Sequence, residues 1–463
     1  MLSGYWHFVP EVLVVAGALG ALFGEFLPGK DRGAAYLAAA LAGVAAVLVA
    51  VGGTGGPMVF GQVEPDGIAR FARAGVAGLT AVWALWVAGR GMPDERRRDA
   101  VALALLAAAG GMLLCMAQDL IVMYIALELS TMPAYVLMGY RRRDVAGLEG
   151  ALKYFLLSML TSLIMLYGLS FLYGVSGSTA FAELSLEGAG LLGLVAVLLT
   201  LVGLFAKLSA APFHYWAPDA YAGAVPASVA FVSTVPKVAG IAVMARLLAA
   251  VAPGVPALVT VVAVASAASM LLGNLAALPQ SDLRRLMAYS GVAHTGYLLM
   301  ALAPGTVSGY GAAVFYAVAY AVPSMAVMLV AAEEGTEVTS VSGLAARRPW
   351  LAWSMVVWLL SLIGIPPLAG FFGKLYLFGA AAEGSLWSLV VLGVITSVVP
   401  AGYYFRVVRE MFFGERATGV AAVGETAPPA SEAALVALAV ATVAIGIGAS
   451  PLLRGLGALL GQG

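Results

Sequence analysis

Four ionisable residues lie inside long apolar stretches of this sequence. Glu128 lies in MYIALELSTMPAY, Lys207 in LFAKLSAAPF, Lys237 in STVPKVAG and Lys374 in GFFGKLYLF. A charge at the centre of a lipid-facing helix costs about 2.5 to 3.5 kcal/mol on insertion scales. We therefore expect these four side chains to face protein, water or each other.

A carboxylate and several lysines in a medium of low dielectric constant can transfer protons. Burial lowers the pKa of a lysine and a nearby carboxylate raises it again, so separating such a pair releases the lysine's proton toward the next site. Arginine stays protonated, which fits apolar stretches that carry lysine and connections that carry arginine. We predict proton translocation through these four residues. The alternatives are that Glu128 is a static counter-ion between helices and that the lysines extend to the membrane surface.

Three further residues are secondary candidates for the same path. Lys153 and His294 lie nearer the ends of apolar stretches, where each is either an interface anchor or a member of the path. His214 follows Pro212 and either caps a broken helix or joins the path.

The composition predicts an all-α polytopic membrane protein. Of 463 residues, 62% are hydrophobic and 10% are charged, which excludes a soluble globular domain. At ~20 residues per span there are about fourteen membrane helices. We place them at 8–27, 34–52, 69–88, 100–117, 119–139, 151–174, 191–211, 228–249, 257–278, 286–302, 309–332, 351–378, 387–408 and 433–453.

Signals for processing, cofactors and metals are missing from the sequence. The first apolar stretch lacks a basic segment before it and a cleavage site after it, so we expect a retained span. Cys115 is the single cysteine, which excludes disulfides, structural zinc and iron–sulfur clusters. Nucleotide, flavin and haem motifs do not occur. We expect the chain to bind no cofactor and no metal.

The basic residues alternate along the chain in a way that predicts topology. Connections after odd-numbered spans carry Lys30, Arg32, Arg284, Arg285, Arg347, Arg348, Arg409, Arg416 and the arginines at 96–98 and 141–143. The other connections carry Glu64, Asp66, Glu183, Glu187 and Glu383, with Arg70 as the main exception. By the positive-inside rule the basic connections are cytoplasmic and both termini lie on the other side.

The sequence also contains an internal repeat. QDLIVMYIALELSTMPAYVLM and QSDLRRLMAYSGVAHTGYLLM align, which equates Tyr135 with Tyr297. Pro212 and the stretch GIPPLAG (364–370) predict helix breaks at matching places. Because each unit has an odd number of spans, the second copy is inverted. We expect three helices in 1–99, five-helix repeats in 100–250 and 257–416, and one helix in 430–463.

The longer motifs resemble a known family. The motifs are LELSTMPAYVLMGYRR, ALKYFLLS, FAKLSAAPFHYWAPDAYAGAVPASVAFVSTVPKVA, GNLAALPQSDLRRLMAYSGVAHTGYLLM and LIGIPPLAGFFGKLYLF, between about Phe71 and Arg416. They look like the antiporter-like membrane subunits of proton-pumping NADH:quinone oxidoreductase (complex I), which are shared with Mrp-type antiporters and membrane-bound hydrogenases. LKYFLLS and the lysine at 374 are most similar to the N-type subunit (plastid B and mitochondrial subunit 2 type).

The resemblance implies specific roles for the buried residues. Glu128 matches the family's glutamate on the fifth helix and Lys207 its partner lysine on the seventh. Lys237 matches the bridging lysine on the eighth helix, and Lys374 the lysine on the twelfth that leads to the exit side. The family's central lysine or histidine on the tenth or eleventh helix has no lysine counterpart here, which leaves His294, tyrosines and water to bridge.

The resemblance further implies a proton-translocating N-type subunit of complex I in a bacterial inner membrane, without a redox centre of its own. NADH or another donor, FMN, iron–sulfur clusters and quinone would belong to partner subunits. The expected neighbours are an M-type subunit, small K-, J- and A-type subunits and the lipid bilayer, with no nucleic acid. The alternatives are an Mrp-type Na⁺/H⁺ antiporter subunit, a membrane subunit of a related hydrogenase, and a structural spacer.

Overall fold

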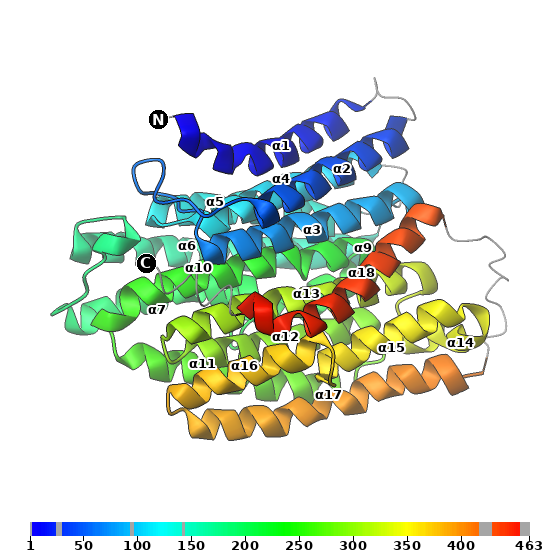
Figure 1. Cartoon of the computed structure of the whole chain (residues 1–463). Helices are drawn as coiled ribbons and strands as arrows, with labels where there is room; N and C mark the ends of the chain where they lie inside the picture. Colours follow the sequence, from blue (N-terminus) through cyan, green and yellow to red (C-terminus); the bar gives the residue numbers. More distant parts are fainter. Residues whose placement is uncertain (1, 25–29, 93–96, 141–143, 416–427, 454–463) are drawn as a thin grey trace.

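The protein is a bundle of long helices that lie side by side and nearly parallel (Figure 1). A computed structural model describes residues 2–24, 30–92, 97–140, 144–415 and 428–453. Helices α1 (Val9–Leu22) and α17 (Trp387–Phe413) lie at opposite edges of the bundle. The remaining helices fill the space between them.

The other elements follow in chain order. They are η1 (Leu2–Phe8), α2 (Lys30–Val51), α3 (Gly67–Arg90), α4 (Arg97–Met116), α5 (Leu120–Met138), α6 (Val145–Ser176), η4 (Phe181–Glu183), α7 (Gly190–Leu208), α8 (Trp216–Gly223), α9 (Pro226–Val232), α10 (Val235–Val251), η5 (Ala252–Gly254), α11 (Ala257–Ala277), α12 (Leu283–Leu302), α13 (Val307–Glu334), η6 (Val338–Val341), α14 (Leu344–Arg347), α15 (Pro349–Ile363), α16 (Ala369–Glu383) and α18 (Pro429–Ile447).

The structure confirms an all-helical multi-pass membrane protein. Within the described ranges, 12 helical segments are long and apolar enough to cross a membrane. The two other predicted spans correspond to α12 and to the pair α15–α16. Helix α12 is less apolar because it carries Arg284, Arg285 and His294, and α15 and α16 are individually short because the chain breaks between them.

Both predicted helix breaks are present. Helix α7 ends at Leu208, and Ser209 has a left-handed backbone (φ 58°) that turns the chain toward α8. Helix α15 ends at Ile363, and the next residue, Gly364, has a φ of 96° that is readily adopted only by glycine. Pro366 and Pro367 follow, and they cannot supply the backbone N–H groups that would continue the helix.

A third break was not predicted. The expected continuous span 228–249 is divided into α9 and α10 at Ser233 and Thr234. Pro236 lies in the first turn of α10, where its missing N–H costs nothing, so it marks the start of a new helix. Lys237 therefore lies at a helix end, as Lys207 does.

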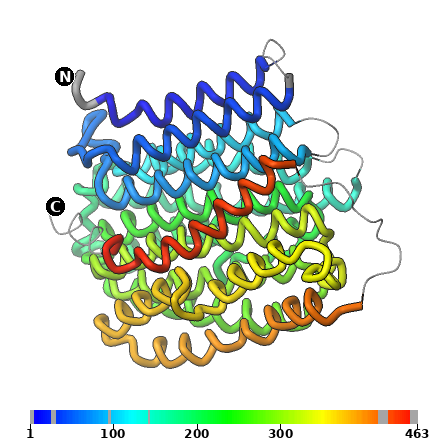
Figure 2. The backbone as a smooth tube through the Cα atoms, turned by 45° about the vertical axis from the view of Figure 1, so that its right-hand side comes forward, coloured from blue at the N-terminus to red at the C-terminus, as the bar shows by residue number. Residues whose placement is uncertain are grey.

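Helix α13 is the centre of the bundle. All of its residues from Gly309 to Ala331 are buried. The chain's last described helix, α18, returns across the bundle to pack against α3, α13 and α16 (Figure 2). A helix enclosed on all sides can carry polar side chains without exposing them to lipid.

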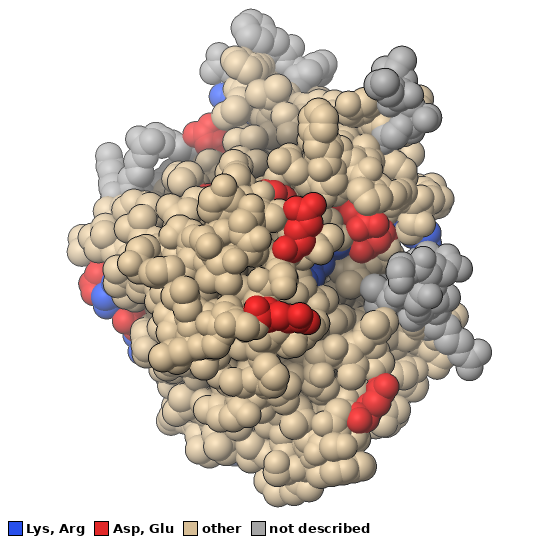
Figure 3. Space-filling view, turned by 90° about the vertical axis from the view of Figure 1, so that its left-hand side faces the viewer, with Lys and Arg blue, Asp and Glu red and all other residues tan. Residues whose placement is uncertain are grey.

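The two ends of the bundle carry different charged residues. Asp and Glu side chains are spread over the end that carries the N-terminus (Figure 3). At the opposite end, Arg284 and Arg285 lie at the start of α12, Arg347 ends α14 and Arg348 caps the start of α15. The predicted basic positions Arg96, 141–143 and Arg416 lie outside the described residues.

One expectation was wrong, because arginine is not confined to the connections. Arg73 of α3 is 3% exposed and forms a double hydrogen bond with Glu11 (2.8 and 2.7 Å). Arg246 of α10 is 6% exposed and donates to Asp66 (2.5 Å) and to the carbonyl of Cys115 (2.9 Å). Each buried guanidinium is offset by a carboxylate, so these arginines fix helix positions.

The packing of α11 on α12 generates a stability prediction. A Cβ atom at Gly273 would lie 2.4 Å from the backbone nitrogen of Ala293, which cannot move independently. We expect Gly273→Ala to destabilise the protein by about 1 to 3 kcal/mol through overpacking. Thermal unfolding of the purified protein in detergent measures the effect.

The matched control is Gly174→Ala in α6, because a Cβ atom there meets no atom within 4 Å. We expect no loss of stability from this change. Equal unfolding temperatures for the two variants would contradict the close approach of α11 and α12.

Candidate functional site

Glu128 and Lys207 form an ion pair in the interior of the bundle. Oε1 of Glu128 lies 3.6 Å from Nζ of Lys207, and the two side chains are 9% and 6% exposed. The ammonium also donates to the hydroxyls of Thr131 (3.2 Å) and Tyr135 (2.6 Å). The Lys207 ammonium therefore has three partners, which matches its three N–H donors.

Local sequence explains how the pair is assembled. Glu128, Thr131 and Tyr135 are spaced by three and four residues, so they share one face of α5. Ser162 of α6 donates a 2.6 Å hydrogen bond to Oε1 of Glu128. Lys207 lies in the last turn of α7, where the helix dipole favours a positive charge.

A hydroxyl connects the end of α7 to α12. Thr295 of α12 shares its single hydroxyl proton between the carbonyls of Leu208 (2.8 Å), the last residue of α7, and Gly291 (2.9 Å). The Gly291 carbonyl also accepts a hydrogen bond from Nζ of Lys237 (3.1 Å). The end of α7 and the second lysine are therefore joined through two residues of α12.

Lys237 is the least stabilised of the buried lysines. It is 5% exposed, and its ammonium lies 5.4 Å from the ring centre of Tyr320. Within the described part of the chain, no ion pair of Lys237 with a carboxylate is found. It lies in the first turn of α10, where the helix dipole opposes a positive charge.

His294 and two tyrosines bridge the centre of the bundle. Nδ1 of His294 lies 2.7 Å from the hydroxyl of Tyr316, and its ring lies 4.6 Å from that of Tyr320. His294 is 1% exposed, and its Nε2 has no hydrogen-bond partner among the residues described. An imidazole can accept and donate a proton on different nitrogens, so it suits a position between two lysines.

Lys374 ends the series on α16. Its ammonium donates to the carbonyls of Leu362 (3.1 Å) and Ile363 (2.8 Å), the last residues of α15, and lies 5.1 Å from the ring centre of Tyr297. These carbonyls have no partner within their own helix because α15 ends there. The second helix break thus supplies acceptors to a lysine that is 4% exposed.

Together these residues form what we call the axis: Glu128, Lys207, Lys237, His294 and Lys374, with Tyr135, Tyr297, Tyr316 and Tyr320 beside them. Two of the secondary candidates lie elsewhere. Lys153 is 45% exposed and pairs with Glu149 (2.9 Å) and Asp219 (3.1 Å). His214 precedes α8, and its carbonyl accepts from the backbone of Ala217 (3.1 Å).

The sequence predicted that tyrosines bridge the centre but did not single out Tyr316 and Tyr320 by number. Ser162 and Thr131 were not predicted, because serine and threonine are common in membrane helices. Tyr316 and Tyr320 are four residues apart, so they share one face of α13. This spacing was the sequence signal that the two hydroxyls belong to one site. It could be interpreted only with the knowledge that α13 is buried from Gly309 to Ala331.

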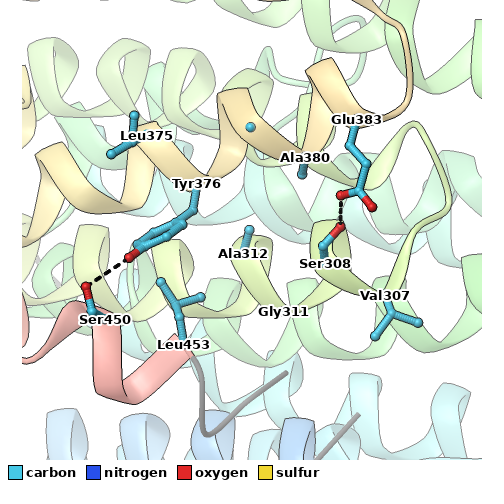
Figure 4. A pocket seen from close by; sticks show the side chains of 11 residues that line it. Val307, Ser308, Gly311, Ala312, Leu375, Tyr376, Ala380, Glu383, Ser450 and Leu453 are labelled. Carbon is cyan, nitrogen blue, oxygen red and sulfur yellow. Dashed lines mark hydrogen bonds between the residues drawn. The ribbon is translucent and has the colours of Figure 1, made fainter. Parts of the chain in front are cut away.

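A cavity of about 550 Å³ opens away from the axis (Figure 4). It lies between α13, α16 and the segment after α18, and no charged member of the axis lines it. Ser308 donates to Glu383 (2.5 Å) on one side, and Tyr376 meets Ser450 (3.3 Å) on the other. Its polar groups are thus already paired with each other.

Residues 117–400 match a family model described as "NADH:quinone oxidoreductase/Mrp antiporter, TM". The chain is 37% identical over 430 residues to NADH-quinone oxidoreductase subunit N 1 of Acidiphilium cryptum, with 89% of each chain covered. It is also 37% identical to NAD(P)H-quinone oxidoreductase subunit 2 of Rippkaea orientalis, over 88% of this chain and 82% of the relative.

Solved structures have the same architecture. A chain of respiratory complex I from Thermus thermophilus superposes with a TM-score of 0.81 at 33% identity, with 96% of this chain and 99% of that chain covered. A chain of the Mrp complex from Dietzia has a TM-score of 0.82 at 23% identity, covering 99% and 97%, which shows a common fold alone.

The geometry around Glu128 generates a second prediction. Ser162→Ala removes the 2.6 Å hydrogen bond to a buried carboxylate whose Oε2 has no partner among the described residues. Hydrogen bonds to charged groups contribute about 1.5 to 3 kcal/mol, so we expect a lower unfolding temperature in detergent. Ser158→Ala, one turn earlier on α6, is the control because the buried Ser158 hydroxyl has no partner in the same ranges. Equal losses in the two variants would mean that the hydrogen bond to Glu128 contributes nothing.

Proposed function

Because the chain belongs to the family of membrane subunits that NADH:quinone oxidoreductases share with Mrp antiporters, we propose that it is the N-type proton-translocating subunit of a complex I-type enzyme. The observation that carries the proposal is the axis itself, in which titratable groups follow one another from α5 to α16 through the buried centre of the bundle. A static scaffold does not require three buried ammonium groups and an imidazole.

Proton transfer along the axis would start at the Glu128–Lys207 pair. While Oε1 of Glu128 lies 3.6 Å from the ammonium, the protonated form of Lys207 is stabilised. Movement of Glu128 away from Lys207 would remove this stabilisation and release the proton toward Lys237. Since direct contacts do not span the whole distance, ordered water would carry the proton between side chains.

Lys237 would act as the intermediate site. Its position at the start of α10 and its carbonyl and ring partners stabilise a positive charge less than the partners of Lys207 do. A proton that reaches it would therefore pass on readily, through His294 and the Tyr316 hydroxyl, to Lys374. The two carbonyls at the end of α15 would hold the ammonium of Lys374 before release.

The energy for translocation would come from partner subunits. Moving one charge against 100 mV costs about 2.3 kcal/mol, and this chain carries no redox group in our proposal. NADH or another donor, FMN, iron–sulfur clusters and quinone would lie in other subunits. An M-type antiporter-like subunit and the small K-, J- and A-type subunits would be the membrane neighbours.

The orientation follows from the two charged ends. We place the arginine-rich end in the cytoplasm and both termini on the opposite side of a bacterial inner membrane.

Equivalent helix N-caps support two inverted repeats at 100–250 and 257–416. Asp119 caps the start of α5 and Asp282 caps the start of α12, and each lies in an isolated β-bridge.

A sodium-translocating antiporter is the rival function, and the composition of the axis argues against it. Sodium ions prefer oxygen ligands, whereas the axis offers three ammonium groups and one carboxylate, that of Glu128. We therefore expect quinone-reductase activity in sealed vesicles to acidify the vesicle interior equally well with potassium in place of sodium salts.

Lys207 provides the decisive variant pair. Lys207→Arg keeps a positive charge beside Glu128 but stays protonated, so the complex should assemble while turnover and pumping fall together by at least about tenfold. Lys207→Ala should lose both activities as well, with weaker assembly because Glu128 is left unpaired. Quinone-reductase-driven proton uptake in sealed vesicles, with assembly scored on native gels, measures these effects.

The control for this pair is Arg409→Ala, which removes an exposed cation of α17 and should leave turnover unchanged. Normal pumping per electron in an assembled Lys207→Arg complex would show that Lys207 is a packing residue. The structural-spacer alternative would then replace our proposal.

A further inference from the structure

We propose that the equivalent tyrosines of the two repeats hold the two outer lysines of the axis through different groups. The hydroxyl of Tyr135 holds Lys207, and the aromatic ring of Tyr297 holds Lys374. The two tyrosines are 162 residues apart and occupy the same place in the aligned segments. This inference rests on the proposed function, because it assigns positioning residues to the same proton path.

The contact of Tyr135 is made by its hydroxyl. Nζ of Lys207 lies 2.6 Å from the oxygen but 5.2 Å from the ring centre. Those two distances place the ammonium beyond the hydroxyl end of the ring, not above its face. The faces and edges of the ring are in contact with Tyr154 (4.8 Å between centres) and Phe155 (5.6 Å).

The contact of Tyr297 is made by its ring. Nζ of Lys374 lies 5.1 Å from the ring centre, within the range of a cation–π interaction. The Tyr297 hydroxyl is engaged elsewhere, since it donates to Thr396 (3.2 Å) and accepts from Asn274 (3.2 Å). The ammonium donates its hydrogen bonds to the carbonyls of Leu362 and Ile363 instead.

Both arrangements give the ammonium three partners. Lys207 has a carboxylate and two hydroxyls, whereas Lys374 has two helix-end carbonyls and an aromatic ring. In the second repeat the Tyr135–Tyr297 spacing of 162 pairs Glu128 with Ser290, and the Asp119–Asp282 spacing of 163 pairs it with Gly291. Neither residue carries a carboxylate, so the ring of Tyr297 becomes the group that compensates the charge.

The loss of the Tyr297 hydroxyl should be well tolerated. Its partner Asn274 also donates to the carbonyl of Met270 (2.9 Å), and Thr396 also donates to that of Leu392 (2.8 Å). Each partner therefore keeps a hydrogen bond in Tyr297→Phe. The opposite holds for Tyr135→Phe, which removes the shortest hydrogen bond of the Lys207 ammonium.

The test compares Tyr135→Phe, Tyr297→Phe and Tyr297→Leu in the assembled complex, with Lys374→Ala as the reference. We measure quinone-reductase-driven proton uptake in sealed vesicles between pH 6 and about pH 9, together with assembly on native gels. Tyr135→Phe should lower uptake by about tenfold, because a hydrogen bond to a charged group is lost. Tyr297→Phe should stay within about twofold of the parent protein.

Tyr297→Leu should move the alkaline limb of the pH profile. Loss of the ring removes stabilisation from the protonated form, so uptake should decline at a pH about one unit lower than in the parent protein. Phenylalanine at the same position should restore the parent profile. A packing defect alone would lower activity at all pH values and would not shift the limb.

The outcomes separate this inference from the proposed function. Three results would overturn the assignment of groups. They are an equal loss of uptake in Tyr297→Phe and Tyr297→Leu, an unshifted alkaline limb in Tyr297→Leu, and normal uptake in Tyr135→Phe. Normal uptake in Lys374→Ala would instead overturn the proposed function, whatever the tyrosine variants do. A loss of proton uptake of about tenfold in Tyr135→Phe, together with a shift of the alkaline limb in Tyr297→Leu alone, would support the assignment of groups.

Discussion

A buried ammonium group has three N–H donors to satisfy, and in this protein a helix end provides two of the partners of Lys374. Continuous membrane helices use most of their carbonyls internally, although Gly291 of α12 also accepts from Lys237. The break after Ile363 releases its carbonyls to Lys374, whereas Lys207, beside the break after Leu208, is held by a carboxylate and two hydroxyls of α5. The placement of the breaks and the placement of the lysines are therefore one structural solution. The helical hydrogen bonds lost at the breaks cost free energy, but the breaks allow charged side chains inside the bundle.

Helix α13 allows polar side chains in the middle of the protein as well. A helix that is enclosed along its length lets Tyr316 and Tyr320 present hydroxyls and rings to His294 without contact with lipid. The proposed path would then need no lysine on α12 or α13 to continue. The buried arginines have the contrasting role, since Arg73 and Arg246 are each fixed by a carboxylate near the acidic end.

Much of this could be read from the sequence because charge inside an apolar stretch is a strong physical signal. Glu128, Lys207, Lys237 and Lys374 were identified by the cost of burying them. Glu128, Lys237 and Lys374 are buried, and the side chain of Lys207 is 6% exposed. Pro212 and the Pro366–Pro367 pair predicted two breaks for a local reason, the absence of backbone donors. The interruption before Lys237 escaped notice because Ser233 and Thr234 fit a helix as well as a turn. The hydroxyl partners escaped because their role depends on which face of a helix meets which neighbour.

The lack of a carboxylate at positions 290 and 291, the counterparts of Glu128, has a consequence for how many protons the axis can hold. Glu128 can neutralise a proton on Lys207, but a proton on Lys237 or Lys374 adds net charge to a medium of low dielectric constant. Two such protons would repel each other, so in the proposed path the second half would hold one proton at a time. Such a path would pass protons in single file and empty before it refills.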